Sequence, residues 1–454
     1  MADPELAAAL RAAGARNVLT ASDPAYPAVA PFDLTGVYTP DAVVAAADAD
    51  DVAAAVTVAS ERGVPIAVFG TGHGAQRVTG GILVTTGGLA GVTVDPDART
   101  ARIGAGTTWG EVLAAITPHG LAALCGAAPG VGVVGYVLGG GLGPIARSHG
   151  FASDHVRAIE IVTPAGGLTT VTGETEPDLF WALRGGKGGF GVVTALTIDL
   201  LPIATVHGGA LYFGADDAER VVRAFAGWAP GLPESAMASF ALLRLPDVPA
   251  LPEPLRGRFV VHVRFVSLDA ADEAERQIAP IRAVATPLLD TVGPLPYAKI
   301  ATVHADPASP MPVVSGSVTM SAFGPDAVGA LLAAAGPAAD IPVSIVEIRA
   351  LGGAVAREAR VPDAVGSRTA AYNLFVSGAP VPGLADTVIA GAVRAVLDAM
   401  APWQDGGHLV NFVGSADGPD AVERSWTPEQ NDRLDAIRAA ADPRGLFPYA
   451  RHGR

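Results

Sequence analysis

Glycine clustering constrains this chain more than any other feature of its sequence. Eight glycines fall within residues 126–143, and shorter clusters lie at 70–74 and 104–106. Because glycine has no Cβ, a ligand can approach the backbone closely, and N–H groups can point at phosphate oxygens. A set of tight bends between short strands is the plainer interpretation. A long cofactor laid along several backbone loops explains the clustering better.

The first cluster, GTGHGA (70–75), fits the pattern G-x-G-x-x-A, and Asp95 lies further along the chain. A Rossmann dinucleotide site requires a helix directly after these glycines. The residues that follow the histidine and its glycine, AQRVTGG, have no apolar stripe, so we expect a loop, and an NAD(P) enzyme is a minor alternative. His73 is then either an ordinary loop residue or a nucleophilic imidazole held against the cofactor.

Composition narrows the class of protein. A chain of 454 residues favours two domains, and with 50% hydrophobic and 17% charged residues it has a globular composition. The net charge of −15 disfavours nucleic acid and anionic membranes as partners. Cys125 is the only cysteine, which excludes an intrachain disulfide, and no apolar run has the length of a signal peptide or membrane span. We expect a cytoplasmic monomer or homodimer.

Periodicity divides the chain into parts. The pattern of residues 1–203 predicts short strands, with helices at 41–62 and 108–119. From 204 to 405, longer alternating strands appear at 205–213, 258–266, 313–323 and 343–351, with helices at 269–285, 325–335 and 385–400. They predict one antiparallel sheet with helices on one face. Residues 406–454 form a compact tail. The predicted strands of the first part are 64–69, 82–86, 92–95, 100–106, 156–163, 168–172 and 191–200.

Polar side chains alternate with apolar ones along the predicted substrate-domain strands. In RFVVHVRFV (258–266), His262 and Arg264 face away from the apolar set. In VSIVEIRAL (343–351), Glu347 and Arg349 also share one face. These faces line either a cavity or the solvent boundary, where an ion pair would have little energetic weight. Tyr372 is a further candidate phenol, with a core aromatic as the alternative.

Several long strings resemble one family. They are PIAVFGTGHG (65–74), ARIGAGTTWGEV (101–112), GAAPGVGVVGYVLGGGLGPIARSHGFASDHV (126–156) and PDLFWALRGGKGGFGVVTALTIDLLP (177–202). They resemble the FAD-linked oxidases of the berberine-bridge-enzyme-like type, in the vanillyl-alcohol-oxidase superfamily. The resemblance runs nearly end to end. It implies an α+β fold in which a PCMH-type FAD-binding domain, residues 1–203 with the tail 406–454, carries an inserted substrate domain, residues 204–405.

The resemblance also implies a cofactor site. His73 falls on the family's flavin-linking histidine and would bond covalently to the 8α carbon of FAD. Asn411 would close the pocket from the tail. The remaining implied cofactor contacts are Phe69, Gly70, Thr71, Gly72, Gly74, Ala128, Gly130, Val131, Gly132, Val134, Gly135, Gly140, Gly141, Gly191, Val192 and Val193.

The chain departs from the family pattern at four places. Ala128 replaces the cysteine of doubly tethered members, so we expect no second tether. Tyr136 replaces a histidine; a phenol can donate a hydrogen bond but cannot carry positive charge. Leu409 replaces a tyrosine that several members use as base. Lys187 alters the string RGGGGNFG, and we expect it in an exposed loop or facing a phosphate.

The expected function follows from the resemblance. It is an FAD-dependent oxidoreductase, an oxidase that removes a hydride from a small alcohol, amine or secondary-metabolite intermediate and passes electrons to O2, giving H2O2. A flavin dehydrogenase with another acceptor and a flavin-binding protein without a catalytic base are the alternatives. No hydrolase motif or metal-ligand spacing is found. The candidate catalytic residues are Tyr136, His262, Glu347, Arg349 and Tyr372.

Overall fold

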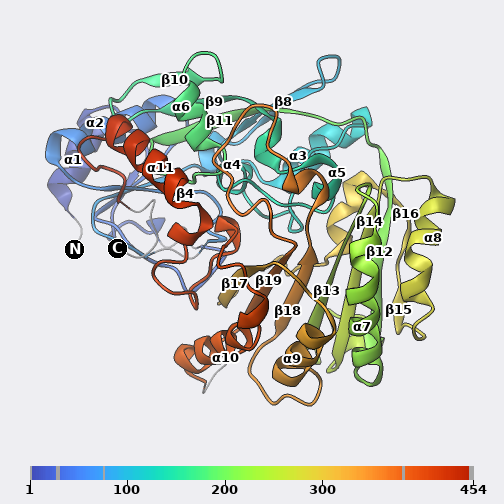
Figure 1. Ribbon diagram of the computed structural model, residues 1–454. Coiled ribbons are helices and arrows are strands. Elements are labelled where there is room, and N and C mark those ends of the chain that lie inside the picture. Colours follow the sequence, from blue (N-terminus) through green and yellow to red (C-terminus); the bar gives the residue numbers. More distant parts are fainter. Residues whose placement is uncertain (1–2, 27–30, 75–76, 381–383, 449–454) are drawn as a thin grey trace.

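The protein is described by a computed structural model that covers residues 3–26, 31–74, 77–380 and 384–448. Figure 1 shows the N-terminal and C-terminal parts of the chain side by side, above a large sheet built from the middle of the chain. This α+β arrangement confirms the predicted fold class. In the described parts of the chain, the helices are all too short or too polar to cross a membrane.

A small sheet holds the first glycine cluster. Its strand order is β1 (Val18–Leu19), β3 (Ala42–Ala45), β6 (Ile82–Thr85) and β4 (Ile66–Phe69), with the last three parallel. Helices α1 (Pro4–Ala12) and α2 (Ala49–Arg62) share a hydrophobic core with it. Strands β2 (Val37–Thr39) and β5 (Arg77–Thr79) form a separate parallel pair.

The predicted helix at 41–62 is wrong in its first part. Val43 and Val44 lie in β3, where both are fully buried in the sheet. The helix begins only after Asp48, whose carboxylate accepts hydrogen bonds from the backbone N–H groups of Asp50 and Asp51. The apolar pattern of a buried strand runs into that of the helix without a break, so the capping aspartate marks the true boundary.

A second, antiparallel sheet packs beside the first. Its order is β10 (Leu168–Val171), β9 (Val156–Val162), β11 (Val192–Asp199), β8 (Thr100–Gly104) and β7 (Val92–Asp95). Helices α3 (Trp109–Ile116), α4 (Val133–Leu138) and α6 (Pro177–Leu183) contribute to its core, and α5 (Ala146–His149) follows α4. The long glycine segment therefore contains a short helix, α4, between its bends.

The third sheet is the predicted antiparallel one. Its strand order is β15 (Leu289–Asp290), β12 (Thr205–Gly214), β14 (Phe259–Ser267), β13 (Ala236–Arg244), β18 (Ile345–Ala350), β19 (Tyr372–Gly378) and β17 (Val314–Met320), and β16 (Gly293–Pro296) pairs with β12. One face packs on α7 (Ala218–Trp228), α8 (Ala271–Arg282), α9 (Pro325–Ala335) and α10 (Asp386–Ala399). Strands β13 and β19 and helix α7 were not predicted.

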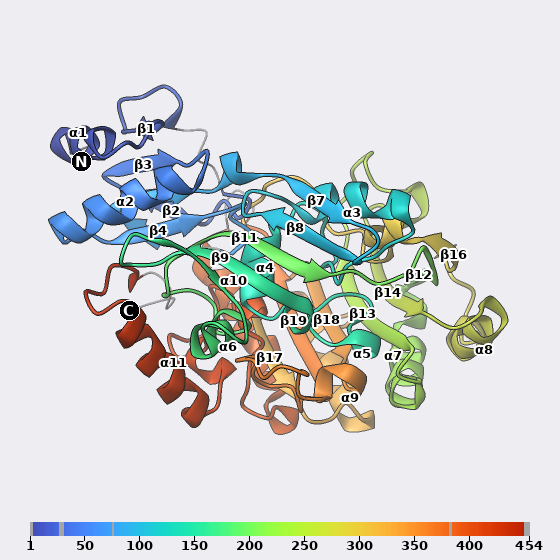
Figure 2. The same ribbon diagram turned by 90° about the horizontal axis from the view of Figure 1, so that it is seen from above.

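The tail returns to the N-terminal part. Helix α11 (Pro428–Ala441) lies beside α6 in Figure 2. Arg438 donates to the carbonyl of Gly186 at 2.9 Å, and the backbone N–H of Ile66 donates to Leu446 at 2.6 Å. These contacts agree with the expected role of the tail, while the domain boundaries at 203 and 405 stay predictions.

Candidate functional site

The loop after β4 holds His73 in a fixed position. Its ring stacks on Phe32 with centroids 3.9 Å apart, and its Nδ1 lies 2.8 Å from the hydroxyl of Thr71. That hydroxyl also accepts from the backbone N–H of Gly132 at 3.2 Å. The other ring nitrogen, Nε2, is buried and has no hydrogen-bond partner among the residues that the structure describes. Burial lowers the pKa of His73 to about 4, so the imidazole is neutral near pH 7.

The three glycine segments converge around this histidine. Gly130, from the long segment, is so close that a Cβ on it would lie 3.8 Å from the His73 ring. The backbone N–H of Val133 donates to Thr107, directly after the 104–106 cluster. By contrast, a Cβ on Gly74 or Gly135 would meet none of the described residues within 4 Å. A buried imidazole nitrogen without a partner therefore borders open glycine backbone, which fits a bulky cofactor such as FAD.

Asn411 connects the C-terminal tail to the glycine segments around His73. Its side-chain N–H donates to the carbonyl of Tyr136 at 2.8 Å, and its Oδ1 accepts from Lys187 Nζ at 2.6 Å. Lys187 is therefore not in an exposed loop, and burial lowers its pKa to about 8. Asn411 also lies against Gly139, where any Cβ would collide with the amide. The C-terminal tail, which we expected to close the cofactor pocket through Asn411, thus contacts α4 and Lys187.

Tyr136 lies on α4, within the long glycine segment. Its ring meets Trp109 edge-on at 5.5 Å, and its hydroxyl is buried without a hydrogen-bond partner. Burial raises its pKa well above the ordinary value, so the phenol stays protonated. It is a candidate hydrogen-bond donor and is a poor proton acceptor.

Several other residues that we expected to contact the cofactor pack in hydrophobic cores. Phe69 packs in a small core with Val43 and Leu83, and Val134 and Val193 belong to the core of the second sheet. Val192 packs toward the first sheet. Their contact with a cofactor remains a prediction, as it does for Gly70, Ala128, Val131, Gly140, Gly141 and Gly191.

A buried charge cluster lies on the helix-free face of the large sheet. Glu347 Oε1 is 3.0 Å from Arg349 Nη2 and 3.0 Å from Arg264 Nη1. All three side chains are at most 8% exposed. The alternative in which this face meets water is therefore wrong. The opposite residues of β14, such as Val261 and Val263, pack on the helices as expected.

Strand register places the cluster in two rows. Ser239 on β13 pairs with Arg264 on β14 and with Arg349 on β18. Ala241, two residues on, pairs in the same way with His262 and Glu347. The two polar side chains of β14 and the two of β18 thus face each other across β13, which lies between these strands. Sequence reasoning placed His262 with Arg264, and Glu347 with Arg349, but nothing in it joined the two pairs.

His262 is a member of the cluster and is neutral. Its Nδ1 accepts from Arg264 Nε at 3.3 Å, and its ring stacks on Tyr212 with centroids 4.1 Å apart. Burial and the positive charge of Arg264 hold its pKa well below the usual value. Since Nδ1 accepts, the proton lies on Nε2, which is buried beside the backbone of Val303.

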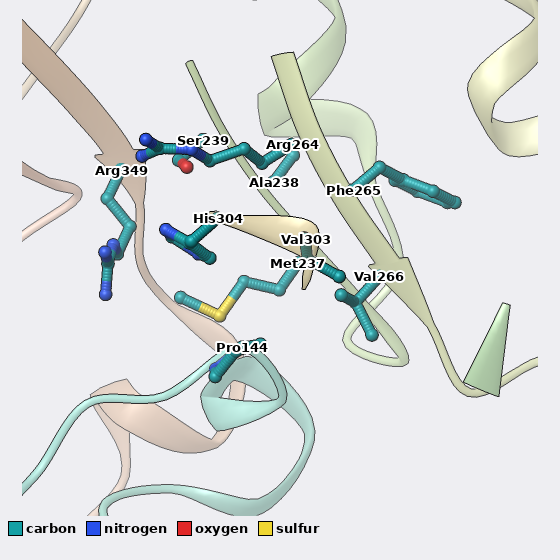
Figure 3. A pocket seen from close by; sticks show the side chains of 10 residues that line it. All are labelled: Pro144, Met237, Ala238, Ser239, Arg264, Phe265, Val266, Val303, His304 and Arg349. Carbon is teal, nitrogen blue, oxygen red and sulfur yellow. The ribbon is translucent and has the colours of Figure 1, made fainter. Parts of the chain in front are cut away.

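A small cavity adjoins the cluster, and Figure 3 shows its lining. Arg264, Arg349, Ser239 and His304 contribute its polar side, and Met237 belongs to its apolar side. His304 follows a 3₁₀ helix that ends at Val303, and its Nδ1 is buried without a partner. No pattern in the sequence points to His304, because a single histidine after a short apolar segment has no diagnostic spacing. Pro144, one residue after the long glycine segment, also lines this cavity.

Tyr372 does not join this group. It lies at the start of β19 in the helix-side core, near Phe323 at 5.9 Å. Its neighbour Asn373 points the other way and has an unpartnered side-chain oxygen. The core alternative for Tyr372 is therefore the correct one, and its candidacy as a catalytic phenol is withdrawn.

Comparison with known proteins agrees with this geometry. Residues 40–172 match the family described as FAD binding domain. The chain is similar to the FAD-dependent monooxygenase FUP4 of Fusarium proliferatum (strain ET1), with 43% identity over 37% of this chain and 34% of that protein. It is also similar to (R)-6-hydroxynicotine oxidase of Paenarthrobacter nicotinovorans, with 28% identity over 64% of each. The matched regions thus span 34% and 64% of the length of these two curated relatives.

Solved structures extend the likeness to the whole fold. Physcomitrella patens BBE-like 1 covers 98% of this chain and 98% of its own, with a TM-score of 0.84 and 20% identity. The chain therefore has the fold of this berberine-bridge-enzyme-like protein. This fold and the match of residues 40–172 to the FAD binding domain confirm the resemblance seen in the sequence.

Proposed function

We propose that this protein is an FAD-dependent oxidase that carries its cofactor on His73. The observation that carries the proposal is the unpartnered Nε2 of a neutral, buried imidazole, which lies among converging glycine segments. Bound FAD would supply a two-electron acceptor for a substrate hydride and pass the electrons to O2. The glycine backbone around His73 and the link from Asn411 to α4 would hold it in place.

The tether is proposed through Nε2, because Thr71 holds Nδ1. A neutral imidazole is a nucleophile, whereas a protonated one is not. His73 Nε2 would hold the flavin at its 8α carbon, where a C–N bond would take the place of one C–H bond. The flavin would itself accept the electron pair of that bond exchange, with O2 as the oxidant that restores it. Ala128 offers no thiol for a second tether.

The polar face of the large sheet would receive the substrate. The two arginines lower the pKa of Glu347 to about 2, so this carboxylate is ionised and is a weak proton acceptor. We assign to Glu347 the positioning of Arg264 and Arg349. His304 also lines the cavity, but burial and the charges of Arg264 and Arg349 hold its pKa well below the usual value, so it too is a weak proton acceptor.

Acid precipitation tests the tether. We expect a yellow pellet from the native protein and a yellow supernatant over a white pellet from His73→Ala. His119→Ala, at an exposed histidine, is the matched control and should keep the yellow pellet. Flavin released from the native protein would overturn the tether and leave FAD binding intact. A colourless protein that takes up no added FAD would overturn the proposed function.

The electron acceptor can be tested without a substrate. The FAD-loaded protein is photoreduced without air and then mixed with air-saturated buffer. An oxidase should reoxidise within seconds and release hydrogen peroxide in proportion to its flavin. Reoxidation over many minutes would show that O2 is not the acceptor and would favour a dehydrogenase.

A further inference from the structure

A second charge cluster lies apart from the polar face of the large sheet. It joins Asp154, in the 3₁₀ helix η4 (Ala152–His155) of the FAD-binding part, to Asp363 and Arg368 of the segment that leads into β19. Arg368 Nη2 lies 2.6 Å from Asp154 Oδ1 and 2.7 Å from Asp363 Oδ2. These three side chains are at most 12% exposed. One nitrogen atom of a buried guanidinium is thus shared by two carboxyl groups.

The two carboxyl groups also form a hydrogen bond with each other. Only a protonated carboxyl can donate a hydrogen bond to another carboxyl, so the pair holds one proton between its members. Burial raises the pKa of Asp363 to about 7, and the hydrogen bond to Asp154 acts in the same direction, whereas Arg368 opposes it. Asp363 is therefore the member that donates, and Asp154 is the member that accepts.

We call residues 361–368, which carry two members of this cluster, the strap. Its start is bound to the end of α6 through Arg184. The Arg184 guanidinium donates to the carbonyls of Val361 and Pro362, and the Arg184 carbonyl accepts from the backbone N–H of Ala364 at 2.8 Å. Arg184 is 1% exposed and is a further charged group that faces the two carboxyls. Because its hydrogen bonds go to carbonyls, this contact remains whether or not the carboxyl pair is protonated.

Beyond Arg184, the strap reaches the long glycine segment and the tail. Val365 is buried, and a Cβ on Gly140 would lie 3.1 Å from its side chain. A Cβ on Gly366 would collide with the carbonyl of Ser425. The strap is thus packed closely on both sides, so a change in the carboxyl pair would be felt at Gly140 and in the tail.

We propose that the strap is a pH-sensitive connection between the large sheet and the FAD-binding part, closed by the proton that Asp154 and Asp363 share and loosened when that proton is lost. This inference goes beyond the proposed oxidase function and does not depend on it. Loss of the proton leaves two carboxylates at one guanidinium nitrogen in a buried place, where like charges repel strongly.

The direction of the pH dependence follows from the position of Asp363. In a loosened strap this carboxyl meets water and ionises at the ordinary pKa of an aspartate, whereas in the closed strap its pKa is raised. The closed strap therefore binds the proton more tightly. Its stability is greatest at acidic pH, falls as the pH rises from the ordinary pKa to the raised one, and is constant above that.

Hydrogen exchange of the FAD-loaded protein tests the strap. Exchange is followed by mass spectrometry from pH 5 to pH 8, and each rate is divided by the intrinsic rate of an unprotected amide at that pH. In the native protein, the protection of residues 361–370 should fall at least about tenfold between pH 5 and pH 7 and change little from pH 7 to pH 8. The protection of β3 and β6 should stay the same.

Asp363→Asn separates the shared proton from other titrating groups, because an amide can donate to Asp154 at every pH. The protection of its strap should agree within about twofold between pH 5 and pH 8. Asp178→Asn, at an exposed aspartate of α6 that pairs with Arg433, is the matched control and should keep the pH dependence of the native protein. Equal protection of the native strap at pH 5 and pH 8, which requires no variant, would overturn the proposal. A loss of protection that persists in Asp363→Asn would overturn it as well, because another group would then control the strap.

Discussion

Gly72 and Gly74 lie on either side of His73 and differ in what they permit. Gly72 has a φ of +70°, and a Cβ there would come within 2.6 Å of Phe69 and Pro31. Gly74 has no such φ, and a Cβ there would meet none of the residues in the described part of the chain. The position of the His73 ring therefore depends on the absence of a side chain at one of these glycines only.

We expect Gly72→Ala to destabilise the cofactor-free protein by at least about 2 kcal/mol, because the left-handed backbone and the close approach both resist a methyl group. Gly74→Ala should leave the stability of the cofactor-free protein within about 0.5 kcal/mol of the native value. Urea unfolding of both variants without FAD measures the difference. Equal stabilities would show that the loop rearranges freely and does not hold His73.

At this scale the sequence identified residues by their local pattern. His73 stands out because it interrupts a glycine cluster, and His262 and Arg264 because they alternate with apolar neighbours. Ser239 lies in the apolar strand β13 and His304 after a short apolar helix, so neither shows a pattern. Both enter the site only through the register of strands far apart in the chain, which a single sequence does not specify.

At the scale of helices and strands, the sequence predicted an element correctly where its apolar and polar residues alternate with a clear period. The strands of the substrate domain that alternate, β12, β14, β17 and β18, were found, whereas β13 was not, because its sequence AMASFALLR is apolar on both faces apart from Ser239 and its last residue. At the start of α2 the apolar pattern of β3 hid the boundary. Asp48 sets that boundary by capping the helix, and it also pairs with Arg16 at 2.5 Å.

The cap at Asp48 can be separated from its ion pair. Asp48→Ala should lower the free energy of unfolding by about 1 kcal/mol. Asp48→Asn should recover most of that loss, because asparagine caps a helix without the charge. Asp50→Ala, in the same first turn but not at the cap, is the control. Should the asparagine variant be as unstable as the alanine variant, the ion pair rather than the cap would set this boundary.

At the scale of the whole molecule, the site forms because the FAD-binding part packs against the helix-free face of the large sheet. Alternation on the strands predicts which residues share a face, and it leaves open whether water or protein covers that face. The FAD-binding part covers it here: Leu142, Pro144 and Arg147 of that part all reach the large sheet or its cavity. The buried cluster and its cavity therefore belong to neither part alone.

Arg147 on α5 is the side chain that joins the two layers most directly. Its guanidinium donates to the carbonyls of Ala236 at 2.8 Å and Leu232 at 3.0 Å, and also to that of Leu351. It is 9% exposed. A methionine in its place would fill similar space and leave these carbonyls without their donor, at a cost of about 1–3 kcal/mol for each that stays dry.

We therefore expect Arg147→Met to loosen the contact between the layers before either layer unfolds. Hydrogen exchange should quicken in α5 and at the start of β13, while exchange in β3 and β6 stays slow. Arg157→Met, at an exposed arginine paired with Asp199, is the control and should change none of these. Uniformly faster exchange over the whole chain would show that Arg147 supports global folding and not the coupling of the layers. Unchanged exchange would show that apolar packing holds the layers together without it.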